Sequence, residues 1–231
     1  MTKLWMKTNL VVLGVILILA ATTLPARAGE VIDRIVATVN GHIILQSDWD
    51  DGLNYEAFSN GRLLDELTPD DRKGALDRLI DQELLREQIR SVDFQHAPQE
   101  EVMKRLLEIR KQYAGSETER GWQAALQRFG LTESQLRKNI VLELDLMRLV
   151  DSRLRPTVNI DSKSIESYYN HELLPQLRGT GAKEPPLAEV SPRIRELLTQ
   201  QKMNQLLTAW LQNLRSGSQI RTEDGSAGAM R

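Results

Sequence analysis

The stretch that decides the fold is TESQLRKNIVLELDLMRLVDSRLR, residues 132–155. Thr132, followed three residues later by Gln135, forms a capping box that begins a helix, and Pro156 marks its end. The apolar side chains of this helix cover more than one stripe, so it should be the central helix of a bundle. These side chains are Leu136, Ile140, Leu144, Met147 and Leu154, with Leu142, Leu146, Leu149 and Val150 beside them.

Three further helices are expected before the central one. Thr68 is a hydroxyl cap followed by proline and two acids, a strong helix start. A second helix opens at Pro98 and is broken by residues 114–116, Ala-Gly-Ser. A third carries an apolar face and stops at Gly130.

The segment before these helices reads as a β-hairpin. An apolar strand over Val31–Val39 meets a second apolar run across Asn40-Gly41, the pair that favours a tight hairpin turn. Ser47 or Asp48 is then expected to cap a short helix that begins near Trp49.

The C-terminal third predicts two more helices and a strand. Asp161 or Ser162 starts the fifth helix. Residues 175–186 form a polar connection rich in glycine and proline, and Pro192 opens a last long helix. Residues 219–222 are expected to form a short strand.

The last helix changes its apolar face along its length. Ile194, Leu197 and Leu198 share one face, whereas the apolar residues between Met203 and Leu214 lie on nearly the opposite one. The two halves therefore cannot bury against the same neighbour. Either the helix bends within a single core, or it bridges two bodies or leaves one face for a partner.

Composition excludes several classes of function. The chain has 231 residues, 41% of them apolar, with 30 basic against 32 acidic side chains and no cysteine. Disulfides, thiolate metal sites and cysteine nucleophiles are thus excluded. Only 5% of the residues are aromatic and the net charge is -2, so we expect no nucleic acid as a partner.

The first 28 residues predict export. Lys3 and Lys7 precede an apolar run over Leu10–Leu24, and Ala26-Arg27-Ala28 is a typical cleavage site. The alternative is a membrane anchor, but this run of about 15 residues is shorter than the roughly 20 that a span needs. We expect residues 1–28 to be a cleaved signal peptide, with no stable membrane insertion afterwards. The mature protein would begin at Gly29 and reside in a bacterial periplasm.

The sequence contains no motif that indicates a catalytic site, a cofactor site or a metal site. His42, His96 and His171 are isolated in sequence, without the spacing of metal ligands. The acidic run from Asp48 resembles a calcium loop, but its twelfth position is Ser59 instead of an acid. The phosphate-binding, zinc-protease and serine-hydrolase motifs are absent from the sequence. We therefore expect no catalytic residues, no cofactor and no metal site.

The order of four segments resembles the SurA-type periplasmic chaperones. They are Val31–Asp48, Leu76–Leu85, Phe129–Arg137 and Pro186–Arg221. The resemblance implies a mainly α fold, a helical SurA-like core bundle with a small N-terminal β-hairpin that a C-terminal strand joins. On this view residues 29–222 form the chaperone core, and residues 223–231 form a disordered tail.

The chain departs from the family at residues 175–186. Family members usually carry one or two parvulin-type isomerase domains at this place, and a domain of about 100 residues cannot fit in a short linker. The resemblance therefore implies an ATP-independent periplasmic chaperone for unfolded outer-membrane proteins or other exported polypeptides, without isomerase activity. The alternative is an envelope adaptor that holds one dedicated partner on the same scaffold. The oligomeric state stays open.

The resemblance also places the ends of the mature chain together. The segment Val31–Leu45 should lie beside the closing segment, with Trp210 buried against it. Adaptable methionine and tyrosine side chains, with one leucine, are the candidates for peptide binding, although each can equally belong to an ordinary core. The candidates are Met103, Leu107, Tyr113, Met147, Tyr168 and Tyr169.

Overall fold

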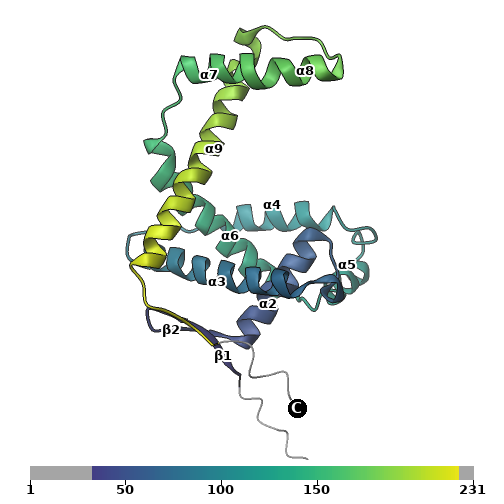
Figure 1. The fold of residues 1–231 in the computed structure, drawn as a ribbon. Helices are drawn as coiled ribbons and strands as arrows, with labels where there is room; N and C mark the ends of the chain where they lie inside the picture. The colour runs from purple at the N-terminus through teal and green to yellow at the C-terminus, as the bar shows by residue number, and fades with distance from the viewer. Residues whose placement is uncertain (1–32, 224–231) are drawn as a thin grey trace, which may run out of the picture. The chain divides into compact units, whose positions relative to one another are not determined.

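The computed structural model describes residues 33–223, and the expected signal peptide and residues 224–231 of the expected tail lie outside this range. Residues 34–223 form one unit that is mainly helical (Figure 1). The strands are β1 (Ile35–Val39), β2 (His42–Leu45) and β3 (Ile220–Thr222). The helices are α2 (Gln46–Asn60), α3 (Pro69–Arg90), α4 (Gln99–Arg110), α5 (Glu119–Gln127), α6 (Glu133–Leu154), α7 (Ser162–Tyr168), α8 (Leu174–Thr180) and α9 (Leu187–Ser216).

The three strands form an antiparallel sheet of order β2-β1-β3, which confirms both the hairpin and the closing strand. Asn40 and Gly41 form the turn with positive φ angles of 49° and 86°. The Asn40 amide also joins three segments, because it donates to Glu87 (2.8 Å) and Ser218 (3.2 Å). Its oxygen accepts the backbone N–H of Gln219 at 2.8 Å. The hairpin, α3 and the C-terminal segment are thereby held together.

The predicted N-cap at Thr68 and the predicted capping box at Thr132 are both present. Thr68 accepts from the backbone of Asp71, and Thr132 accepts from that of Gln135. The helix expected near Trp49 is different: α2 begins at Gln46 and is a full 15 residues long. Asp48 contributes to its start by accepting the backbone N–H of Leu45 at 2.9 Å, so the carboxylate acts from inside the first turn.

Two proline-based boundaries in the C-terminal third were wrong. The expected connection over residues 175–186 is helical as far as Thr180, and Pro175 lies at the second position of α8, directly after a π-helical turn over Tyr169–Leu173. α9 already begins at Leu187, so Pro192 lies inside it instead of opening it. The carbonyl that Pro192 leaves without a helical donor belongs to Ala188, which is exposed to solvent.

α9 connects two groups of helices, as its split apolar pattern suggests. Its N-terminal half lies against α7, and its C-terminal half packs against α3 and α6 (Figure 1). Trp210 is buried as predicted, but its cluster contains Leu85 and Leu149 rather than hairpin residues. The hairpin cluster is reached instead by Leu214 and Ile220. The two halves of α9 therefore pack against different neighbours, as predicted, but within one unit, and Trp210 has a different neighbour from the one expected.

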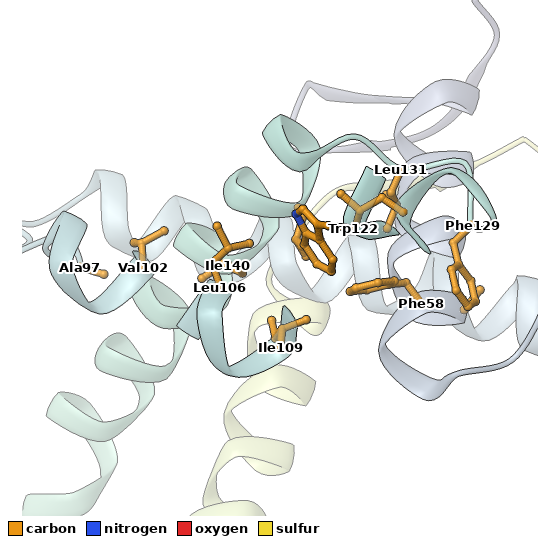
Figure 2. Close-up of a cluster of buried hydrophobic side chains, with 12 residues drawn as sticks. Phe58, Ala97, Val102, Leu106, Ile109, Trp122, Phe129, Leu131 and Ile140 are labelled. Atoms are coloured by element: carbon orange, nitrogen blue, oxygen red, sulfur yellow. The ribbon is translucent and has the colours of Figure 1, made fainter. Parts of the chain in front are cut away.

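The largest core cluster is aromatic and joins α2, α4, α5 and α6 (Figure 2). Trp122 is fully buried there, edge-on to Phe58 at 6.3 Å between ring centroids. Phe58 also stacks on Tyr113 at 4.5 Å and meets Phe129 at 5.5 Å. Leu136 and Ile140 of α6 belong to this cluster, so this face of α6 is covered along the N-terminal part of the helix.

Candidate functional site

A groove of about 710 Å³ lies between α3 and α6. Lining residues from α2 and α9 lie at its two ends, and residues of β2 lie along its side. A volume of this order matches typical ligand pockets, and it would hold a few residues of a polypeptide. The groove is therefore the candidate site for peptide binding.

The apolar lining comes mainly from the second face of α6. Leu142, Leu146 and Val150 follow one another at intervals of four residues along the groove, and Met147 lies at its edge. Met147 is 60% exposed, and its three companions are half-buried. Leu146 and Val150 also contact the cluster that contains Leu207 of α9, so the apolar part of the groove lies toward α9.

The opposite end of the groove, beside α2, is polar. Tyr55 donates a hydrogen bond to Glu143 at 2.7 Å, and Glu56 is paired with Arg78. Asp51 accepts a hydrogen bond from the side-chain amide of Gln135 at 2.9 Å. Burial, together with the bond to the Glu143 carboxylate, raises the pKa of Tyr55, so its hydroxyl stays protonated and continues to donate.

A buried carboxylate fixes the side of the groove next to β2. Glu83 is only 2% exposed and pairs with Arg90 at 2.6 Å and with Arg86 at 3.6 Å. His42 of β2 lies 3.6 Å from the same carboxylate. Because a buried charge is costly without partners, this cluster is a structural link between the hairpin and α3.

The structure brings only one of the six predicted peptide-binding residues to the groove. Met147 lines it, whereas Met103 and Leu107 lie on the exposed side of α4. The sulfur of Met103 accepts a hydrogen bond from Arg137. Tyr113 belongs to the aromatic cluster, where its hydroxyl donates to the backbone oxygen of Phe58.

The remaining two candidates are half-buried at the junction of α7 with the π-helical turn Tyr169–Leu173. Tyr169 donates to the carbonyl of Pro185 at 2.8 Å, which fastens the connection that follows α8. Neither Tyr168 nor Tyr169 lines the groove. The six candidates therefore do not form one site.

The sequence did contain a signal for the residues that were missed. The apolar set of α6 was too wide for one stripe, and its surplus members Leu142, Leu146 and Val150 are the ones that line the groove. Leu79 of α3 and Ile43 of β2 gave no such signal, because each belongs to an ordinary apolar pattern.

The described residues contain no cluster of acids and histidines suited to hold a metal ion. Across residues 33–223, no helix combines the length and apolar character that crossing a bilayer requires.

The family model described as the SurA-like N-terminal domain matches residues 1–149. This range is more than half of the 231 residues, so the chain belongs to the SurA-like N-terminal domain family. The match ends inside α6, and α7, α8, α9 and β3 lie beyond it. A comparison with the curated proteins finds no match.

Proposed function

We propose that this protein is an ATP-independent periplasmic chaperone that holds unfolded outer-membrane proteins or other exported polypeptides in the groove between α3 and α6. The observation that carries the proposal is the second apolar face of α6, which stays partly exposed in a chain of the SurA-like family. A binding site without ATP must work at equilibrium, and an open apolar groove with an adaptable methionine suits varied clients.

The direct test is suppression of aggregation. An unfolded β-barrel protein is diluted from urea at rising ratios of the chaperone, and light scattering is followed. We expect scattering to fall as the ratio rises. Unchanged scattering at an excess of chaperone would contradict the proposal, and capture of one folded envelope protein by crosslinking would then favour the adaptor alternative.

A matched pair of variants locates the activity. Met147→Gln removes an exposed apolar side chain from the groove, and Leu107→Gln removes one from the outer side of α4. Burying a methionine side chain is worth about 1.5–3 kcal/mol, so Met147→Gln should weaken client binding by roughly tenfold. Leu107→Gln should bind like the wild type, and an equal loss in both variants would place binding outside the groove.

The proposal includes the absence of isomerase activity. Only residues 169–186 connect α7 to α9, and they are occupied by a π-helical turn, α8 and a short connection. A parvulin-type domain of about 100 residues has no room there. A coupled prolyl-peptide assay should show no acceleration above background. Acceleration proportional to protein concentration would overturn this part of the proposal.

Residence in the periplasm is tested separately. Protein from a periplasmic fraction should begin at Gly29 by N-terminal sequencing, because cleavage is expected after Ala28. Recovery of the chain from the membrane fraction with Met1 intact would contradict export in soluble form.

A further inference from the structure

The charges of the groove are distributed unevenly. On the β2 side, Glu83 pairs with Arg86 and lies 3.6 Å from His42, whereas the two ends of the groove differ in charge. Beside α2 the lining contains four carboxylates, those of Asp48, Asp51, Glu56 and Glu143. The cationic lining groups at this end are Arg78 and Lys138. At the α9 end, the polar lining from α9 consists of the neutral amides Gln200 and Asn204.

Two of the four carboxylates are neutralised by nearby arginines. Glu56 is paired with Arg78, and Glu143 lies 3.6 Å from Arg105. Asp48 and Asp51 are different, because they accept hydrogen bonds from neutral donors, namely the Leu45 backbone and the Gln135 amide. The anionic character of the α2 end therefore rests mainly on these two aspartates.

Few positive charges lie close to Asp48 and Asp51. Lys138 stands one helical turn beyond Gln135 on α6, and it makes no ion pair within the described residues. The positive end of the α2 dipole partly offsets Asp48, which lies in the first turn. Asp51 lies further along α2, beyond the first turn, and accepts from Gln135 through Oδ1, so the helix dipole offsets its charge less than that of Asp48.

The spacing of the two ends follows from α6. Lys138, level with the aspartates, and Val150, in the apolar part, are separated by twelve residues of helix, which corresponds to about 18 Å at 1.5 Å per residue. An extended polypeptide covers that distance in about five or six residues at roughly 3.3 Å each. One bound segment can thus contact both ends.

We propose that the groove selects client segments in which an apolar side chain and a lysine or arginine lie about five residues apart. The apolar side chain occupies the α9 end, beside Met147, and the cation lies beside Asp51. This inference rests on the proposed chaperone function and specifies the class of segment that the groove recognises. Electrostatic complementarity of this kind contributes more to specificity than to total affinity.

The test uses two labelled peptides and fluorescence anisotropy. Both peptides have the same apolar centre. About five residues to either side of this centre, one peptide carries lysine and the other carries glutamate. Because a partly exposed ion pair is worth up to about 1 kcal/mol, we expect the lysine peptide to bind about three- to fivefold more tightly. The preference should shrink when the salt concentration rises from about 0.1 M to about 1 M.

Three variants sharpen the result. Asp51→Asn keeps an oxygen that can accept from Gln135, and it should remove most of the preference. Lys138→Gln should enlarge the preference, since it deletes the opposing cation. Glu166→Gln, on the exposed surface of α7 and outside the groove, should leave it unchanged.

The outcomes separate this inference from the proposed function. Equal affinity for both peptides, or a preference that Asp51→Asn leaves intact, overturns the charge selectivity while chaperone binding stands. If neither peptide binds, both the selectivity and the groove as a client site are overturned.

Discussion

Two faces of α6 differ in burial, although the residues on both are apolar. Leu136 and Ile140 are fully buried against α4, α5 and the aromatic cluster. Leu142, Leu146 and Val150, on another face, are half-buried and line a groove, and Met147 at the edge of this groove is 60% exposed. The difference lies in the neighbours, because α4 and α5 cover the first face while α3 leaves the second partly open.

The comparison shows how one helix can serve stability and binding separately. On the covered face the side chains pack without large voids, so truncating one of them lowers the free energy of unfolding. A half-open face contributes less to folding, and its apolar area remains available to a partner. The account therefore predicts large stability effects on the first face of α6 and binding effects on the second.

The largest expected effect comes from removing the helix that borders the open face. Deletion of residues 192–231 removes Met203 and Trp210 from their cluster and removes β3 from the sheet. We expect a fragment that aggregates or unfolds without cooperativity in a urea melt. A cooperative transition with a near-normal midpoint would show that α9 is an appendage.

Trp122→Ala tests the packing of α5 against the covered face of α6. Trp122 is fully buried, and its indole N–H donates to Glu133 at 2.8 Å. Truncating a buried tryptophan costs about 3–5 kcal/mol of unfolding free energy, which urea melts measure. Leu107→Ala, at a site that is 51% exposed, is the control and should change stability by less than about 0.5 kcal/mol. Similar losses in both variants would contradict the assignment of the closed core.

Glu133→Gln gives a smaller, pH-dependent effect on the same face. Burial raises the pKa of Glu133, but the hydrogen bonds from Arg137 and Trp122 outweigh it and hold the pKa below its ordinary value of 4.5. A lowered pKa in the folded state stabilises above the unfolded value and is lost as the pH falls through the folded value. The wild type should therefore exceed the variant by up to about 1 kcal/mol at neutral pH.

This advantage should shrink below about pH 4.5 and vanish in stronger acid. Urea midpoints of both proteins, measured at neutral pH and in acid, provide the comparison. A gap that stays constant or widens on acidification would show that the Glu133 carboxylate is not stabilised as described.

The helical bundle could be predicted from sequence wherever local chemistry decides the structure. Thr68 and Thr132 cap their helices through contacts within three residues, and Asn40-Gly41 sets the turn through its own backbone angles. Pro175 and Pro192 misled the prediction, because proline is compatible with the first turns of a helix as well as with a connection.

The site was harder to predict, since exposure depends on which helices meet. Tyr113 looked adaptable but stacks on Phe58, a partner 55 residues away in the chain. Met103 and Met147 are both exposed methionines on helices, yet only Met147 faces the groove. The useful signal was that the apolar residues of α6 cover more than one stripe. Candidates chosen by residue type alone did not include Leu142, Leu146 or Val150.

Site-specific photo-crosslinking tests the open face of α6 most directly. A photoreactive amino acid is placed at position 147 in one protein and at position 107 in another, each otherwise the full chain, and each is mixed with an unfolded β-barrel client. Both positions are exposed, so both proteins should fold, as urea melts can verify. The account predicts strong crosslinks to the client from position 147 and weak ones from position 107. Crosslinks mainly from position 107, or none from position 147 while aggregation is still suppressed, would contradict it.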